Sequence, residues 1–146
     1  FKEQSTFISE VELLELIKLY IWQNLSNATL SIDHLISKFH LSRATLYRLF
    51  KDEGGVKNFI QQERLQRCYY SLAYISPVYP QSINCQAIAA QWGFNNYASF
   101  NRLFRQQYGF SPTEIARTPL LPALNAVSFY SPSDTTWVNQ FHQWVA

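Results

Sequence analysis

Two short stretches decide the fold of this chain, and they share one pattern: Leu46-Tyr47-Arg48-Leu49-Phe50-Lys51 and Phe100-Asn101-Arg102-Leu103-Phe104-Arg105. In both stretches, bulky apolar residues stand at the first, fourth and fifth positions, and an arginine stands at the third. Apolar residues three and four positions apart form one face of a helix. The second stretch follows the first at an offset of 54 residues, which also places Gly55 on Gly109. The chain therefore repeats one helical unit.

The residues before each stretch repeat at an offset of 53: Leu35, Ile36, Phe39 and Leu41 fall on Ile88, Ala89, Trp92 and Phe94. The turn inside the second unit is thus expected to be one residue longer. Ile36 and Ala89 stand where the helices of each unit cross, and Gly93 supplies a glycine for the second turn. Two short helices joined by a tight turn indicate a helix-turn-helix motif.

The remaining segments also predict helices. Ser9 and Glu12 have the spacing of a capping box at the start of an apolar stripe made of Val11, Leu14, Ile17, Ile21 and Leu25. A longer stripe predicts a helix from Val56 to Tyr74, ahead of Pro77 and Pro80: Phe59, Ile60, Leu65, Cys68, Leu72 and Ile75. Ser111-Pro112-Thr113-Glu114 predicts a short closing helix to Arg117. We expect an all-α fold of about seven helices.

Composition limits the classes of protein that the chain can belong to. With 146 residues, 47% of them apolar and 15% charged, it is expected to fold around a real core. The sequence contains neither a long apolar run nor a secretory signal, which favours a cytoplasmic protein. The two cysteines, Cys68 and Cys85, stand among apolar residues and are expected to pack as small hydrophobes. The absence of methionine at position 1 suggests that a natural start lies upstream.

Charge is distributed unevenly along the chain. The formal net charge is +2, but residues 26–117 alone carry +5, against −2 for residues 1–25 and −1 for residues 118–146. A basic helical unit can follow a phosphate backbone, because each neutralised phosphate releases counterions.

A set of spaced residues in the second unit resembles the signature of the AraC/XylS family of bacterial transcription regulators: Ile88-Ala89, Gly93-Phe94, Phe100, Arg102, Phe104, Arg105, Gly109 and Ser111-Pro112. The first unit is similar to the family in another set: Leu41-Ser42, Leu46, Arg48-Leu49-Phe50-Lys51, Gly55, Phe59-Ile60 and Arg64-Leu65. The resemblance covers about residues 9 to 117. Two departures are an isoleucine at position 36, where the family usually has alanine, and one residue fewer between Gly55 and Phe59.

The resemblance implies the C-terminal DNA-binding domain of such a regulator, with a homeodomain-like fold. It implies a first helix-turn-helix subdomain over residues 1–55, a linker helix over 56–76 and a second subdomain over 77–117. Residues 118–146 form an extension that is not part of the family pattern. The expected partner is double-stranded DNA, read by both recognition helices in successive major-groove segments. RNA polymerase is a further expected partner if the protein is an activator, and an effector-binding or dimerisation domain is expected upstream.

The second helix of each unit exposes residues suited to reading bases, and these are the expected base contacts: Arg43, Ala44, Tyr47, Arg48, Tyr97, Ala98, Ser99, Asn101 and Arg102. The expected phosphate contacts stand at helix starts and toward helix ends: Ser31, Ser42, Thr45, Lys51, Asn95 and Arg105. Alternatives remain for several of these residues. The arginines can be solvated or ion-paired, the two tyrosines can lie in a groove of their own domain, and Lys51 and Arg105 can form structural pairs.

Enzyme chemistry finds little support in the sequence. His34, His40 and His142 lack the neighbours that a metal site needs, and no hydrolase or phosphate-loop motif is present, so no catalytic residue, metal or cofactor is expected. The alternative function is a protein-interaction module with weak or non-specific DNA binding. In the extension, Pro119, Pro122 and Pro132 precede the aromatic residues Trp137, Phe141 and Trp144, which either pack back on the domain or form an interface.

Overall fold

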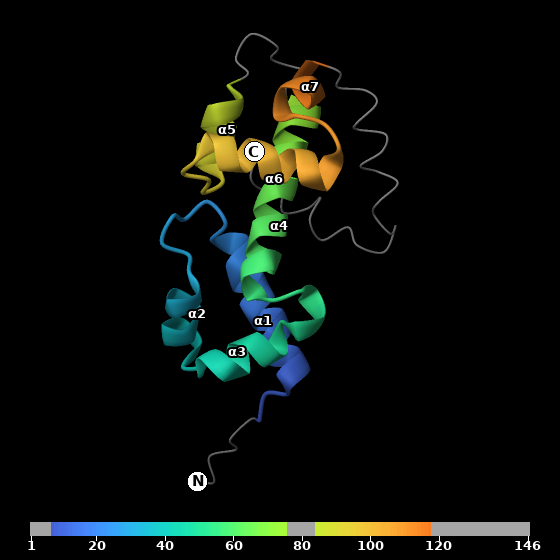
Figure 1. Cartoon of the computed structure of the whole chain (residues 1–146). Coiled ribbons are helices and arrows are strands. Elements are labelled where there is room, and N and C mark those ends of the chain that lie inside the picture. Colours follow the sequence, from blue (N-terminus) through green and yellow to red (C-terminus); the bar gives the residue numbers. More distant parts are fainter. Residues whose placement is uncertain (1–6, 76–83, 118–146) are drawn as a thin grey trace.

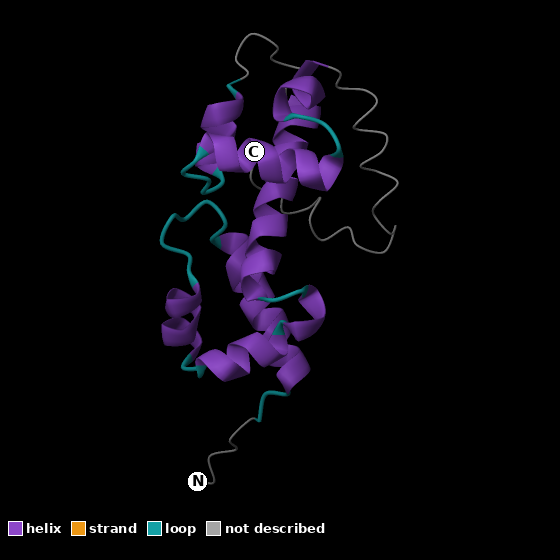
Figure 2. Cartoon of the chain, in the orientation of Figure 1, coloured by secondary structure: helices purple, strands orange, loops and turns teal. Residues whose placement is uncertain are grey.

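The computed structural model describes residues 7–75 and 84–117. Every regular element in these residues is helical, which confirms the expected all-α fold (Figure 2). In chain order they are α1 (Glu10–Gln23), α2 (Ile32–Phe39), α3 (Arg43–Leu49), the 3₁₀ turn η1 (Lys51–Glu53), α4 (Val56–Tyr70), the π-helical turn η2 (Ser71–Ile75), α5 (Cys85–Gln91), α6 (Tyr97–Tyr108) and α7 (Pro112–Arg117). The expectations for residues 76–83 and for the extension 118–146 lie outside the described residues.

Helix α4 is the axis of the molecule, with α1, α2 and α3 around one end and α5, α6 and α7 around the other (Figure 1). It begins at Val56, directly after Gly55, whose φ of 97° is a backbone conformation that favours glycine. We call α1 to α3 the first unit and α5 to α7 the second unit. None of the helices in the described part of the chain combines the length and the apolar character that a membrane crossing needs.

The core of the first unit joins three helices to the N-terminal half of α4. Phe50 is fully buried, and its ring centroid lies 5.3 Å from that of Phe59 on α4. The inward positions predicted for α3 are confirmed, since Leu46 and Leu49 are buried as well. Residues of α1, of the connection after it and of α2 complete this core: Ile17, Ile21, Leu25 and Leu35.

One residue of the predicted stripe on α1 does not belong to the core. Val11 is 72% exposed, so the prediction for this position is wrong. The first turn of α1 extends below α3 at the lower end of the molecule (Figure 1), and no helix among the described residues covers Val11 there.

The core of the second unit is built on the C-terminal half of α4. Phe100 and Phe104 are fully buried, and the Phe104 ring stacks against Tyr69 of α4 at a centroid distance of 6.2 Å. Trp92 donates from Nε1 to Ser71 Oγ over 3.4 Å. The two units therefore pack on the two halves of α4, and the second also contacts the turn η2 that follows it.

The turns of the two units confirm the repeat. In the first, His40 has φ 53° and the amide of Leu41 donates to the carbonyl of Ile36 over 3.1 Å. In the second, Gly93 has φ 90° and the amide of Phe94 donates to the carbonyl of Ala89 over 3.0 Å. These bonds relate residues at the expected offset of 53.

The N-caps show where the additional residue of the second turn lies. Ser42 caps α3 by accepting from the Thr45 amide over 3.1 Å, and Asn96 caps α6 by accepting from the Ser99 amide over 2.9 Å. Asn95 therefore has no counterpart in the first turn. The expectation that α6 starts near Asn95 is corrected by one residue, because Asn96 has the extended backbone and the side-chain bond of an N-cap.

Candidate nucleic-acid interface

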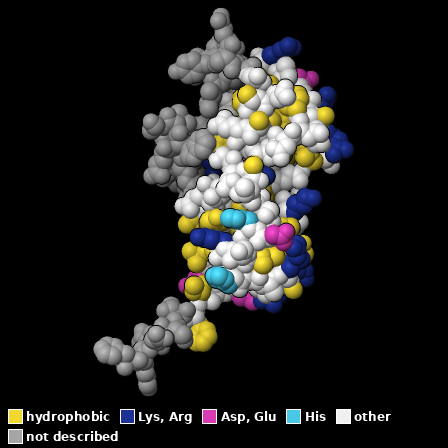
Figure 3. Space-filling view, turned by 90° about the vertical axis from the view of Figure 1, so that its left-hand side faces the viewer, with side chains coloured by type: hydrophobic (Ala, Val, Ile, Leu, Met, Phe, Trp, Pro, Cys, Tyr) yellow, Lys and Arg dark blue, Asp and Glu magenta, His cyan; other side chains and the backbone are white. Residues whose placement is uncertain are grey.

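Helices α3 and α6 are the second helices of the two helix-turn-helix units. In Figure 1, α6 crosses in front of α4, and α3 crosses in front of α1 below the start of α4. In Figure 3, which is turned by 90°, Lys and Arg side chains gather along the right-hand edge over both halves of the molecule. That edge faced the viewer in Figure 1. The exposed sides of the two recognition helices thus contribute to one basic face of the chain.

The exposed side of α3 holds the residues that the sequence placed there. Arg43, Ala44, Tyr47 and Arg48 are exposed, as is Lys51 in the 3₁₀ turn that follows. Tyr47 is 46% exposed, and its hydroxyl accepts a bond from Arg43 Nη1 over 3.4 Å. A helix with these side chains on its outer face can present donors and a ring to the edges of bases.

Both arginines of α3 are ion-paired in the chain alone. Arg43 pairs with Asp33 of α2, and Arg48 Nη2 lies 2.6 Å from Glu10 Oε1 of α1. The ion-paired alternative is therefore realised in the absence of a ligand. Nothing in the spacing of these residues indicates the pairs, because Glu10 lies 38 positions from Arg48 in the sequence.

The exposed side of α6 differs from that of α3. Ala98, Arg102 and Arg105 are exposed, and Arg102 has no ion pair with any residue in ranges 7–75 and 84–117. Arg105 lies near Glu114 of α7. A hydrogen bond from the Ser111 backbone lowers the pKa of Glu114, and the charge of Arg105 adds to this effect. Arg102 is thus the cation of α6 most available to a ligand.

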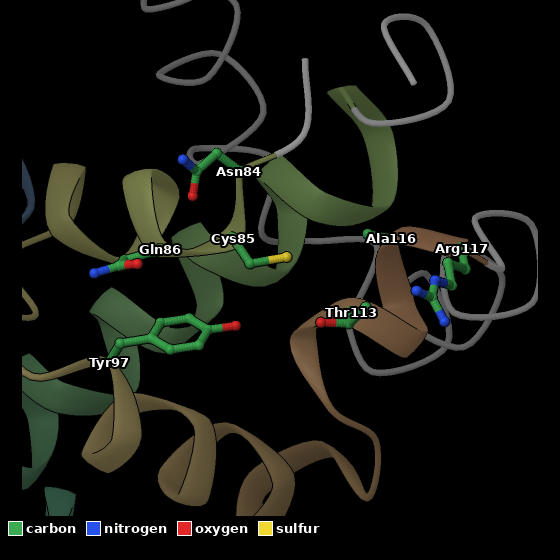
Figure 4. A pocket seen from close by; sticks show the side chains of 7 residues that line it. All are labelled: Asn84, Cys85, Gln86, Tyr97, Thr113, Ala116 and Arg117. Atoms are coloured by element: carbon green, nitrogen blue, oxygen red, sulfur yellow. The ribbon is translucent and has the colours of Figure 1, made fainter. Parts of the chain in front are cut away.

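Three residues expected on the outer side of α6 are less accessible than predicted. Tyr97, Ser99 and Asn101 are half-buried. The Tyr97 hydroxyl points into a pocket of about 550 Å³ between Cys85 of α5 and Thr113 of α7 (Figure 4), and burial raises the pKa of Tyr97. The structure therefore favours the alternative in which Tyr97 lies in a groove of its own domain. Asn101 Oδ1 is buried and accepts no hydrogen bond from residues 7–75 or 84–117.

The expected phosphate contacts at helix starts are engaged in capping. The Ser31 hydroxyl accepts from the His34 amide over 3.1 Å, and the Ser42 hydroxyl is bonded to Thr45 Oγ1 over 2.8 Å as well as to its amide. Thr45 is half-buried, and Asn95 is exposed in the turn before its neighbour caps α6. These caps leave the first backbone amides of α2 and α3 at the surface, where a phosphate oxygen can accept from them.

A family model described as a helix-turn-helix domain matches residues 35–118, which include both turns and both recognition helices. The chain belongs to the AraC family of helix-turn-helix transcription regulators. This confirms the family resemblance that the repeated signature indicated. Members of the family are DNA-binding regulators of transcription.

Two relatives named as transcriptional activators agree with this family. The chain is 32% identical over 85 residues to the "HTH-type transcriptional activator RhaS" of Mannheimia succiniciproducens, which covers 57% of the chain and 30% of the relative. It is 29% identical over 103 residues to the "Transcriptional activator RhrA" of Rhizobium meliloti, which covers 69% of the chain and 31% of the relative. The chain thus spans less than a third of the length of these two relatives.

Similarity to a solved structure supports the fold. The C-terminal domain of AraT, a response regulator from Geobacillus stearothermophilus, superposes with a TM-score of 0.62 at 19% identity, covering 73% of the chain and 84% of that domain. This confirms the homeodomain-like arrangement of helices expected from the resemblance.

Proposed function

We propose that the chain binds double-stranded DNA in a sequence-specific manner as the DNA-reading part of a bacterial transcription regulator. The observation that carries this proposal is the repeat of the turn geometry, which presents α3 and α6 from two equivalent frameworks with Arg48 and Arg102 at equivalent exposed positions. In this motif the second helix enters the major groove, and its outer residues read base edges.

We assign base reading to residues on the outer sides of the two recognition helices: Arg43, Ala44, Tyr47 and Arg48 on α3, and Ala98, Ser99, Asn101 and Arg102 on α6. An arginine can bind guanine O6 and N7 together, and an alanine can contact the thymine methyl group. Asn101 requires a turn of its amide before it can reach a base, because its Oδ1 is buried in the free chain. Tyr97 supports α6 from within the second unit.

Phosphate contacts would position these helices on the duplex. Lys51 and Arg105 stand at equivalent positions toward the ends of the two recognition segments, and both are exposed. The helix starts at Ser31 and Ser42 offer backbone amides to phosphates, with Thr45 and Asn95 nearby. On this assignment the first subdomain spans residues 1–55, the linker 56–76 and the second subdomain 77–117.

The geometry of B-DNA sets the expected form of the site. Two helices that enter successive major-groove segments on one face lie about 34 Å apart, which is about 10 base pairs. We therefore expect an asymmetric site of two short elements about one helical turn apart. Because α4 is a single continuous helix between the units, DNA is expected to bend to satisfy both helices.

Selection from a random pool of duplex DNA at about 0.1 M salt tests the proposal. Enrichment of two short elements about one helical turn apart supports it. Repetition with Arg48→Ala and with Arg102→Ala assigns the elements, because each variant is expected to lose one element and keep the other. A pool without enriched sequences contradicts sequence-specific reading.

Regulation of transcription brings further expected partners. The names of the relatives RhaS and RhrA describe transcriptional activators. We propose that the regulator acts at the bacterial nucleoid and contacts RNA polymerase if it activates, and that its role is binding and not catalysis.

A second candidate function is binding to another protein. Exposed apolar residues on α1 and just before it support this candidate. Five large apolar side chains are exposed there: Phe7 at 92%, Ile8 at 54%, Val11 at 72%, Leu16 at 46% and Leu19 at 40%. Such a strip is suited to contact with another protein. Salt separates the candidates, because binding through phosphates weakens steeply as salt rises, whereas an apolar interface is far less sensitive.

A further inference from the structure

Arg64 stands in the middle of α4, between the turns that carry the two cores, and its side chain reaches toward the first unit. Its Nε donates to the carbonyl of Leu25 over 3.0 Å, and its Nη2 donates to the carbonyl of Asn27 over 3.1 Å. Both carbonyls belong to the connection between α1 and α2, just after α1 ends. The guanidinium is charged, so its hydrogen bonds to these carbonyls are stronger than those between neutral groups.

The same guanidinium lies against the turn of the second unit. A Cβ atom placed on Gly93 would stand 2.7 Å from Arg64 Cζ and 2.9 Å from its Nε and Nη2. The φ of 90° at Gly93 favours glycine, and any side chain there would also displace the guanidinium of Arg64 from its present position. One side chain thus contacts the α1–α2 connection of one unit and the turn before the recognition helix of the other.

Because Arg64 is partly buried, its guanidinium would destabilise the fold if it had no hydrogen-bond acceptors. The side chain is half-buried, and burial lowers its pKa, although an arginine remains charged. The two bonds to carbonyls compensate for the water that the guanidinium has lost. An alanine would remove both bonds and open the space next to Gly93.

We propose that Arg64 is a positioning residue that holds the two helix-turn-helix units at one relative placement and so sets the spacing of the two DNA elements. This inference rests on the proposed function, because it presumes that both recognition helices read DNA. Each unit has its own core on α4, so Arg64 acts on the relation between the units and not on either recognition helix alone. One added base pair moves an element by about 3.4 Å and rotates it by about 35°, which a fixed pair of helices cannot follow.

Binding to duplexes of altered spacing tests the inference. The two selected elements are placed at the selected spacing and at one base pair more or less, and each element is also tested alone. The wild-type chain is expected to prefer the selected spacing by about tenfold. Arg64→Ala is expected to reduce this preference to about twofold, while the affinity for a single element changes little. Arg64→Lys keeps the charge but cannot donate two bonds from a planar fork, so it is expected to lose most of the preference.

Lys57→Ala is the matched control. Lys57 is exposed on the same helix and carries the same charge, so its removal is expected to lower the affinity for all duplexes evenly and to keep the spacing preference. If Arg64→Ala only lowers the affinity evenly, as this control does, the inference is overturned and the proposed function stands.

A measurement without DNA separates the inference from the proposed function. Spin labels are attached at Ala44→Cys and Ala98→Cys, which occupy equivalent exposed positions on the two recognition helices, in a chain with Cys68→Ala and Cys85→Ala. The distribution of distances between the two spin labels is expected to be narrow in the chain without further changes and in Lys57→Ala. It is expected to be broader in Arg64→Ala and Arg64→Lys. Identical narrow distributions in all four chains overturn the inference. A wild-type chain that binds paired elements no better than single ones overturns both the inference and the two-element function.

Discussion

Arg48 of α3 donates a hydrogen bond to the carboxylate of Glu10 in the first turn of α1, with 2.6 Å between Nη2 and Oε1. Arg43 is held in a similar way by Asp33 of α2. Both pairs are largely exposed, with side-chain exposures of 61% and 68% for Arg48 and Glu10. An exposed pair contributes only about 0.2 to 1 kcal/mol, so DNA can displace the carboxylates from the arginines that would read it.

Glu10→Gln is expected to increase the affinity for DNA, because Arg48 then contacts DNA without first breaking an ion pair with Glu10. The increase should reach about fivefold at low salt and decline as salt rises. Titration of labelled duplex at two salt concentrations measures it. Glu15→Gln changes the charge equally on the same helix but removes only a pair with Lys18, 3.8 Å away, and Lys18 keeps its closer pair with Glu53. Equal gains in both variants would indicate a general effect of net charge.

Arg102→Ala is expected to lower the affinity for the selected site by about 1 to 3 kcal/mol and to relax specificity in one element only. The reason is that Arg102 is exposed and has no ion pair within the described residues. Its contact with a base is therefore not offset by a broken ion pair, and the alanine variant loses the full contribution of that contact. Competition among site variants with single base changes measures this effect. An equal loss on every sequence would identify Arg102 as a phosphate contact.

His40→Gly is expected to raise the free energy of unfolding by up to about 1 kcal/mol. His40 has φ 53° at the position that Gly93 occupies in the second unit, and a side chain is strained in this backbone conformation. The gain is partly offset by the greater freedom of glycine in the unfolded chain. Urea unfolding measures the difference. The reverse change, Gly93→Ala, is expected to destabilise the fold, and a stable Gly93→Ala chain would contradict the account of both turns.

Glu63→Gln is expected to stabilise the fold at neutral pH. Burial raises the pKa of Glu63 above its ordinary value of 4.5, despite a hydrogen bond from Trp22 and the charge of Arg67. The folded chain therefore binds this proton more tightly than the unfolded chain, and the stability that protonation contributes is lost as the pH rises from about 4.5 through the raised pKa. Glutamine removes this loss.

Urea unfolding between pH 4 and pH 7 measures the pH dependence. Glu12→Gln provides a contrast of opposite sign, because the Ser9 capping box lowers the pKa of Glu12 and its contribution is lost as the pH falls. A Glu63→Gln chain with the pH profile of the wild type would show that Glu63 titrates alike in the folded and unfolded chain.

The sequence by itself determined the helices, their caps and the repeat. Leu46 and Phe50 on α3 and Phe100 and Phe104 on α6 were predicted to face inward, and all four are fully buried. Helical spacing and N-caps act over three or four residues, so their signals are written in neighbouring positions of the chain. For the same reason the additional residue of the second turn could be expected from the change of offset, although the cap itself had to be located at Asn96.

The tertiary structure decided which of these side chains are available to a ligand. The pairing of Arg48 with Glu10, the turn of Tyr97 into its pocket and the contact of Arg64 with Gly93 each join residues from different helices or turns. Val11 follows the helical spacing and is nevertheless exposed, because α1 extends beyond its neighbours there. Ion pairs and hydrogen bonds act over a few ångströms, so the crossing of the helices determines them, and spacing along the chain does not.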